Sequence, residues 1–301
     1  MDRMNPAAEF SPEIMEKVAR MEYRARMVVN GLMAGQHKSS SRGFNVEFLE
    51  HRQYYPGDDL KHVDWKVYAR RDRFYVKQHE EEANLRAYIL LDASGSMTYG
   101  DGGKLEYGRQ LAAALAYLLI KQNDAVGLYV AGGSGSEVLE PMSSQAHLYR
   151  ILGTMARAGA GGGAGLGVKL RDLGERMKRR GIAIVISDFL EDQGPVRESL
   201  KILRGRGNDI SVFHVMDSNE TGFPFTRASK FLDPETGVGI TADPTAVKAV
   251  YLKALGNFIK GYRDFCARAG MDYTFAQTAR SPEEVLLEYL QKRERSGRKR
   301  K

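Results

Sequence analysis

Short apolar runs bounded by polar turns alternate, from residue 85 onward, with longer stretches in which apolar residues recur every three or four positions. The apolar runs predict buried strands, and the spaced stretches predict helices packed on them. The predicted strands are 85–92, 125–131, 182–187, 210–216 and 271–276, with a short antiparallel edge strand at 137–139. The predicted helices are 104–122, 143–157, 165–180, 195–204, 244–269 and a last helix that begins at Ser281. This alternation predicts an α/β fold with a doubly wound, mostly parallel sheet and helices on both faces.

The first 84 residues follow a different pattern. A helix is predicted at 11–34, because Ser11 and Pro12 form a start signal and Gly35 a stop signal. Two strand-like pieces, 44–52 and 73–78, flank a turn at Pro56 and Gly57.

We therefore expect three parts in the chain. They are an N-terminal helix with a small β segment at 1–84, the α/β domain at 85–290 and a basic tail at 291–301. Within the α/β domain, residues 217–243 lack helical spacing and predict a β-hairpin that turns at 235–237 and is held against the body by its phenylalanines.

The net charge of +7 is concentrated at the end of the chain. The last ten residues hold seven basic residues and one acidic residue, so the rest of the chain is close to neutral. A basic end interrupted by Gly and Ser predicts a disordered, solvated tail, and no specific nucleic-acid site is expected. Weak contact of this tail with nucleic acid or anionic lipid stays open as the alternative.

Neither a membrane span nor a signal peptide is predicted. No run of about 18 apolar residues occurs, and charged residues are mixed into the first thirty. The single cysteine, Cys266, cannot form an internal disulfide, which agrees with a reducing compartment. We therefore expect a cytoplasmic protein.

The polar turn after the first strand of the predicted sheet holds the most specific chemistry. Asp92, Ser94 and Ser96 alternate along a tight turn around Gly95, so a carboxylate and two hydroxyls can point at one position. Hard oxygen ligands of this kind suit Mg²⁺ or Mn²⁺, and the carboxyl edge of an open α/β sheet is where ligands bind. The alternative is a Ser/Gly turn in which Asp92 acts only as a cap.

Residues 43–82 mix aromatic, basic and acidic side chains around the only tryptophan, Trp65. Interleaved aromatic and basic residues are typical of platforms for single-stranded nucleic acid, but Asp58, Asp59 and Asp64 would repel phosphates. Structural ion pairs within the segment and a protein-interaction surface are therefore the favoured alternatives.

Three motifs stand in order along the chain: Arg52-x-Tyr54-x-Pro56-Gly57-Asp58-Asp59, then Val63-Asp64-Trp65, then Asp92-x-Ser94-x-Ser96-Met97. Together, over about residues 35–290, they resemble the bacterial family called domain of unknown function 58. The resemblance implies a von Willebrand factor A-like domain, with a metal-ion-dependent adhesion site on a Rossmann-like sheet. It also implies a frequent association with MoxR-type AAA+ ATPases.

The resemblance implies the rest of the cation site as well. In the family pattern the strand before Asp188 lies beside the first strand, so Asp188 supplies a second carboxylate next to Asp92. Relatives with a complete site have a threonine after the glycines of the intervening loop, where this chain has Ala164. The missing hydroxyl should weaken Mg²⁺ binding without abolishing it, since this ion keeps several waters.

Common enzyme signatures are not met. Ser94 stands where a haloacid dehalogenase phosphatase needs its second carboxylate, and Ser136 stands where a nucleophile elbow needs its last glycine. The segment from Gly100 to Lys104 lacks the spacing of a P-loop. A Mg²⁺-dependent hydrolase or phosphoryl-transfer enzyme stays open as the alternative function, although no positioned base is visible.

We therefore expect a non-enzymatic protein-interaction module. A cation held by four residues would leave one coordination position open for an acidic side chain of the partner, and these residues are Asp92, Ser94, Ser96 and Asp188. Apolar side chains should exclude water around that position. The candidates for this role are Met97, Tyr99, Phe189 and Leu190, with ordinary core packing as the alternative for each.

Overall fold

The computed structural model describes residues 11–38, 48–53, 75–79, 85–100, 103–132, 135–161, 165–235 and 237–298. The chain divides into two compact units, a larger one of residues 1–33 and 86–301 and a smaller one of residues 34–85. The smaller unit thus begins within the last residues of the first helix, which ends at Lys38, and ends directly before the first strand of the larger unit.

In the smaller unit, β1 (Phe48–Gln53) and β2 (Tyr75–His79) pair antiparallel, as expected for the two strand-like pieces. The turn at Pro56 and Gly57 and the tryptophan Trp65 lie outside the described residues.

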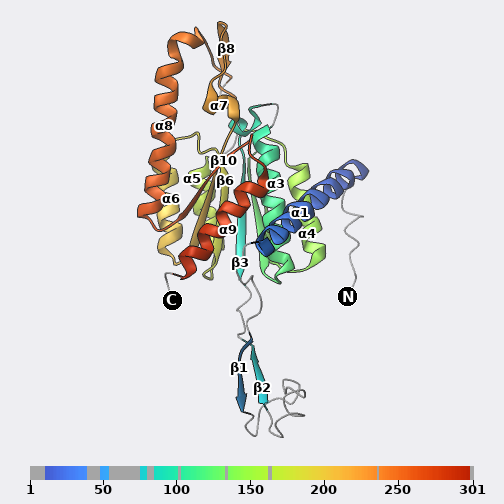
Figure 1. The fold of residues 1–301 in the computed structure, drawn as a ribbon. Coiled ribbons are helices and arrows are strands. Elements are labelled where there is room, and N and C mark those ends of the chain that lie inside the picture. The colour runs from blue at the N-terminus through green and yellow to red at the C-terminus, as the bar shows by residue number, and fades with distance from the viewer. Residues whose placement is uncertain are drawn as a thin grey trace. The chain divides into compact units, whose positions relative to one another are not determined.

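The larger unit is built on a six-stranded sheet with the order β10-β7-β6-β3-β4-β5 (Figure 1). All neighbouring strands run parallel except β4 and β5, which pair antiparallel at one edge. The doubly wound, mostly parallel α/β fold that the hydrophobic pattern predicts is confirmed. The strands are β3 (Arg86–Ala93), β4 (Ala125–Gly132), β5 (Gly135–Met142), β6 (Ile182–Ser187), β7 (Asp209–Met216) and β10 (Asp272–Gln277).

Helices cover both faces of this sheet, as expected (Figure 1). One face packs against α1 (Pro12–Lys38), α3 (Gly103–Lys121), α4 (Gln145–Arg157) and α9 (Pro282–Arg298). The other face packs against α5 (Leu166–Arg176), α6 (Gln193–Gly205) and α8 (Pro244–Arg268).

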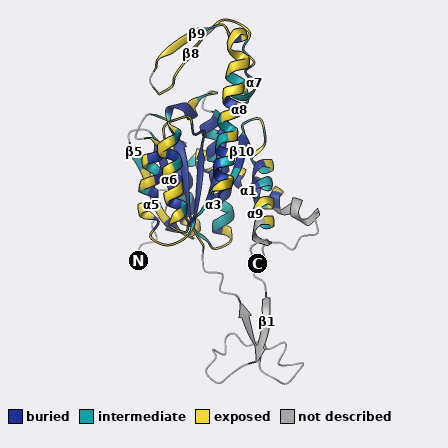
Figure 2. Cartoon of the chain, turned by 90° about the vertical axis from the view of Figure 1, so that its left-hand side faces the viewer, coloured by how far each residue is buried: buried dark blue, intermediate teal, exposed yellow. Residues whose placement is uncertain are grey.

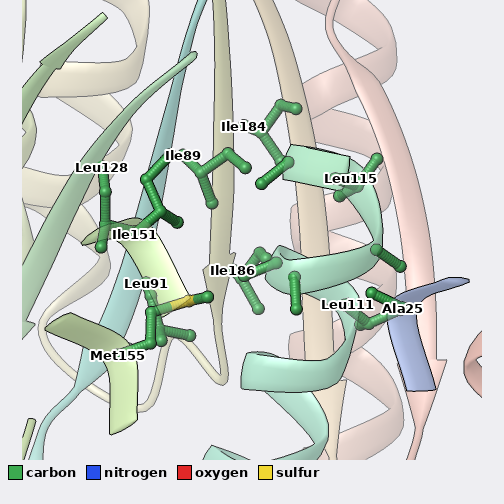
Figure 3. Packing of buried hydrophobic residues seen from close by; sticks show 14 of the residues in the cluster. Ala25, Ile89, Leu91, Leu111, Leu115, Leu128, Ile151, Met155, Ile184 and Ile186 are labelled. Carbon is green, nitrogen blue, oxygen red and sulfur yellow. The ribbon is translucent and has the colours of Figure 1, made fainter. Parts of the chain in front are cut away.

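Strand β3 lies in the interior of the sheet and separates two apolar cores. Its side chains alternate, so Ile89 and Leu91 enter one core, which Figure 3 shows, while Tyr88 and Leu90 enter the other. Every residue of β3 after Arg86 is buried, and Figure 2 shows the same burial along the inner strands. Burial on both faces explains why the strand reads as a continuous apolar run.

The segment 217–243 forms the expected hairpin and, in addition, a helix that the sequence pattern missed. The helix α7 (Ser218–Gly222) is short, and Asp217 begins it with a capping box, a local hydrogen-bond pattern that apolar spacing does not reveal. The strands β8 (Ser229–Leu232) and β9 (Gly239–Ala242) pair antiparallel with each other.

Phenylalanines hold this hairpin, as predicted. Phe223 lies 5.2 Å from Phe225, 5.8 Å from Phe231 and 4.7 Å from Tyr251 of α8, measured between ring centroids. The base of the hairpin is therefore attached to α8 by an aromatic cluster.

Three helix ends differ from the sequence prediction by four residues or more. Helix α1 continues to Lys38, past the stop predicted at Gly35. Helix α5 ends at Arg176 and not at residue 180, because residues 178–180 are all basic and offer the core no apolar side chain. Helix α9 continues to Arg298, although a disordered tail was expected from residue 291. The extra turns are anchored by Arg293, which donates hydrogen bonds to Ser211 and Tyr289. No helix in the described ranges is both long and apolar enough to cross a membrane.

Candidate functional site

The candidate site lies where β3 and β6 end. The two strands are parallel neighbours, with Leu91 opposite Ile186, so their carboxyl ends lie side by side. Asp92 is the last residue but one of β3, and Asp188 directly follows β6. Both carboxylates are buried, Asp188 almost completely. The structure thus brings together the two acids that the family resemblance pairs.

The turn after β3 is shaped by Asp92 itself. The Ser94 backbone N–H donates to Asp92 Oδ1 at 2.9 Å, and a short 3-10 helix, η3 (Gly95–Thr98), follows. The Ser94 and Ser96 hydroxyl oxygens lie 3.1 Å apart. The second Asp92 oxygen accepts a hydrogen bond from the buried hydroxyl of Ser187. One carboxylate and two hydroxyls therefore converge, as the Asp-x-Ser-x-Ser spacing predicts.

Asp188 is held by an unusual turn of its own. The next residue, Phe189, has φ of +56°, a left-handed conformation that costs a non-glycine residue free energy and clusters at functional sites. This turn lets the Leu190 backbone N–H donate to Asp188 Oδ1 at 3.1 Å. The Ser96 hydroxyl donates to the same oxygen at 3.2 Å, which links the two halves of the site directly.

Lys104 and Glu220 are two site residues that the sequence reasoning missed. The fully buried Lys104 Nζ lies 2.7 Å from Asp188 Oδ2 and 2.8 Å from Glu220 Oε1. Burial lowers the pKa of Lys104, but the carboxylates of Asp188 and Glu220 outweigh this and leave that pKa raised. Glu220 is oriented by the capping box of α7, in which its other oxygen accepts from the Asp217 backbone N–H at 2.8 Å.

A signal for Lys104 did exist in the sequence. Lys104 stands in line with Gly108 and Leu111, on the face of α3 that packs against the sheet. A lysine on an otherwise buried face needs buried carboxylate partners, because an isolated charge is costly in an apolar core.

A cavity of about 180 Å³ opens at this point. Its lining includes the predicted ligands Asp92, Ser94, Ser96 and Asp188, together with Gly161, Gly165, Leu166, Leu190, Glu191 and Glu235. Both Glu191 oxygens accept backbone N–H groups at the start of α5, from Leu166 at 2.8 Å and Gly167 at 3.0 Å. Glu191 therefore fixes the wall of the cavity.

The charge balance of the cavity fits a divalent cation. Burial, together with the negative charge of Asp188, raises the pKa of Asp92 well above its usual range. Lys104 does not relieve this, since its ammonium already pairs with Asp188 and Glu220. A bound cation would supply the missing positive charge, and the oxygens of Asp92, Asp188 and the two serines are ligands that Mg²⁺ and Mn²⁺ accept. In the part of the chain that the structure describes, no group of three or more His, Cys, Asp or Glu side chains could by itself hold a metal.

The four apolar residues expected around the site separate into two kinds. Met97 and Phe189 are fully buried and belong to the two cores, so a partner cannot contact them. Phe189 is buried because its left-handed backbone turns the side chain into the core, where its ring centroid lies 5.0 Å from that of Tyr262. Leu190 is 42% exposed and lines the cavity, and Tyr99 is half-buried with its ring 5.7 Å from Lys104 Nζ. Ala164 lies outside the described residues.

Residues 50–255 match the model of the family described as "Protein of unknown function DUF58". The chain belongs to this family. Uncharacterized proteins of Mycobacterium tuberculosis and Mycobacterium bovis are each 27% identical to this DUF58 chain over 234 residues, which cover 75% of it and 73% of each of them.

Three solved structures are also similar to this DUF58 chain. BatB from Bacteroides thetaiotaomicron is 16% identical, with a TM-score of 0.43, and the match covers 69% of this chain and 98% of BatB. The SpRpn10 VWA domain is 14% identical, with a TM-score of 0.40 and coverage of 69% and 94%. Manganese-loaded TRAP protein of Plasmodium vivax is 17% identical, with a TM-score of 0.32 and coverage of 43% and 56%. No residue role follows from these likenesses.

Proposed function

We propose that this DUF58 protein is a non-enzymatic protein-interaction module whose cation site binds an acidic side chain of a partner. In this proposal Asp92, Ser94, Ser96 and Asp188 hold Mg²⁺ or Mn²⁺ and leave one coordination position open. A carboxylate of the partner fills that position. The partner we propose is a MoxR-type AAA+ ATPase.

The observation that supports the cation is the convergence of two buried carboxylates and two hydroxyls at one open cavity. So far as the described residues show, Asp92 accepts hydrogen bonds only from neutral groups, which are the backbone N–H and hydroxyl of Ser94 and the hydroxyl of Ser187. Excess negative charge inside a low-dielectric site attracts a cation strongly. A bound Mg²⁺ or Mn²⁺ would act here as the contact point for an external oxygen ligand.

The family resemblance supports the proposed class of partner, and the fold supports the proposed docking surface. Membership in DUF58 supports an association with MoxR-type ATPases, as the resemblance implies. Ligands of open α/β sheets bind at the carboxyl ends of the strands, which is the edge where the cavity opens. Leu190 and Tyr99 border the site and would help to exclude water from a docked carboxylate.

A Mg²⁺-dependent hydrolase would need a general base beside the cation. Of the two further acids that line the cavity, Glu191 uses both oxygens to hold the start of α5. Glu235 accepts a backbone hydrogen bond from Ser96. Neither observation favours an enzyme, so we propose the interaction module alone.

Titration calorimetry with Mg²⁺ tests the cation site. The wild-type protein should bind Mg²⁺, and Asp92→Asn, which has the same shape without the charge, should abolish binding. Unchanged affinity in a folded Asp92→Asn protein would place the cation elsewhere.

Co-purification with a co-expressed MoxR-type ATPase tests the docking surface. The double variant Ser94→Ala with Ser96→Ala changes little volume and should reduce co-purification by about tenfold, or about 1.4 kcal/mol. The control is Ser143→Ala, an exposed serine that follows β5. Full binding by the folded double variant would contradict the proposal and make the segment around Tyr54 to Trp65 the better candidate surface.

A further inference from the structure

The tip of the β8–β9 hairpin reaches into the candidate cation site. Ser96 in η3 donates its backbone N–H to Glu235 Oε1 at 3.0 Å, and Glu235 lines the same cavity as Asp92 and Asp188. Glu235 lies far along the chain from the Asp-x-Ser-x-Ser motif, and nothing in the local sequence pattern links them. The structure thus adds the carboxylate of Glu235 to a cavity that Asp92, Asp188 and Glu191 already line.

The contact is close enough to constrain the motif. A Cβ atom on Gly95 would lie 2.8 Å from the Pro234 carbonyl oxygen and 3.1 Å from Glu235 Oε1. Gly95 is not among the described glycines with positive φ, so its backbone conformation does not require a glycine. The close approach of the hairpin tip does require one.

The tip is preformed by its own hydrogen bonds. The Glu235 backbone N–H donates to Asp233 Oδ1 at 2.9 Å, and the Gly237 N–H donates to the Asp233 carbonyl at 2.8 Å. Glu235 is therefore presented from a defined turn, which lowers the entropy cost of placing its carboxylate in the site.

The strands of the hairpin are only weakly held in place. Strands β8 and β9 pair with each other and not with the main sheet, and such isolated hairpins are marginally stable. Most of the hairpin is exposed (Figure 2). Its large apolar side chains Leu232, Val238 and Ile240 are 61%, 64% and 69% exposed. Besides the aromatic cluster at its base, the hydrogen bond from Ser96 to Glu235 connects the hairpin to the main body.

We propose that Glu235 is a built-in carboxylate ligand of the cation, which occupies the open coordination position until a partner's acidic side chain displaces it. The inference rests on the proposed function, because it needs a cation in the site. Asp92, Asp188, Glu191 and Glu235 line the same cavity, and a cation bound there would offset the repulsion between their carboxylates. Displacement of Glu235 would free the hairpin and offer its exposed apolar residues to the same partner.

Hydrogen exchange of the hairpin amides tests this inference. In the wild-type protein, exchange of residues 229–242 should slow by about tenfold when Mg²⁺ replaces EDTA, because the cation ties down the tip. In Glu235→Gln this Mg²⁺-dependent protection should fall to less than about twofold. The matched control is Glu175→Gln, which removes an equal charge from an exposed position near the end of α5 and should behave like the wild type.

A second variant leaves Glu235 intact. Gly95→Ala places a methyl group against the Pro234 carbonyl and should unseat the tip, so it should also lose the Mg²⁺-dependent protection. Mg²⁺ protection that persists in both variants would overturn the inference.

Calorimetry on the same samples separates the two proposals. If the wild-type protein binds Mg²⁺ through Asp92 but its hairpin exchanges equally in Mg²⁺ and EDTA, only the role of Glu235 is wrong. If the wild-type protein binds no Mg²⁺, the proposed function is wrong and the built-in ligand with it.

Discussion

The two ends of the main sheet differ in how their carboxylates are paired. At the amino end, Arg293 of α9 lies 3.4 Å from Asp272 and 3.8 Å from Asp209, the first residues of β10 and β7. Asp209 is also paired with Arg204 at 3.2 Å. At the carboxyl end, Asp92 and Asp188 face one cavity, with Lys104 as the cation of the described ion pairs there.

This difference separates charge that serves stability from charge that serves binding. Balanced pairs at the edge of a sheet need no ligand and hold their helices in place. An excess of buried carboxylate is destabilising without a counter-charge, and such uncompensated charge is typical of functional sites. The carboxyl end is therefore the end at which to look for a ligand.

The largest expected effect is the loss of Lys104. Lys104→Met leaves Asp188 and Glu220 buried without their counter-charge and should lower the free energy of unfolding by about 3–5 kcal/mol. Urea unfolding in EDTA measures this change.

The matched change at the amino end is Arg293→Met, whose ion pairs are partly exposed. This variant should lower the free energy of unfolding by about 1 kcal/mol. Equal losses of unfolding free energy in Lys104→Met and Arg293→Met would show that the charges at the two ends of the sheet are equally well compensated.

The second effect concerns the strength of the carboxyl end as a cation site. Ala164→Thr should restore a hydroxyl ligand and tighten Mg²⁺ binding by about tenfold, or about 1.4 kcal/mol. Calorimetry on the wild type and the variant compares the two affinities. Equal or weaker binding by Ala164→Thr would mean that residue 164 does not face the cation, or that a water already fills this position.

The smallest effect is a pH dependence that arises at the amino end. His147 in α4 is buried, and its Nε2 lies 2.8 Å from the carbonyl oxygen of Val126, near the start of β4. Burial lowers the pKa of His147, with the charge of Arg150 adding to the shift and the contact with Val126 opposing it. The unfolded chain then binds the proton more readily, so this contribution to stability is complete above about pH 6.5 and falls as the pH drops.

Replacing His147 by Gln removes this titration. Unfolding free energies at neutral and mildly acidic pH should fall less steeply for His147→Gln than for the wild type, by at most about 1.4 kcal/mol per pH unit. Parallel pH profiles for the two proteins would rule out a contribution from His147.

The fold could be predicted from the sequence because most of its helices and strands have local apolar patterns. Strand β6 has the bounds that its apolar run predicts, and β3 differs by one residue at each end. The pairing of β3 with β6, which the family resemblance implied, is also confirmed. Helix α7 and the extra length of α9 were missed, because a capping box and the contacts of Arg293 are not apolar patterns.

The candidate site was predictable only in part, for a related reason. Asp92, Ser94 and Ser96 share one turn, so their spacing reveals them. Lys104 and Glu235 come from other elements and reach the site through tertiary contacts. Helical spacing places Lys104 on the buried face of α3 but does not identify its carboxylate partners. Phe189 was expected at the surface because it follows Asp188, but its left-handed backbone turns it into the core.

The inserted unit of residues 34–85 has a mechanical consequence. It ends one residue before β3 begins, and the other end of β3 carries Asp92. At this junction the insertion is therefore joined to the candidate site by a single strand. Because β4 and β6 pair with β3 in parallel on its two sides, two ladders of hydrogen bonds hold the strand that links the insertion to the site.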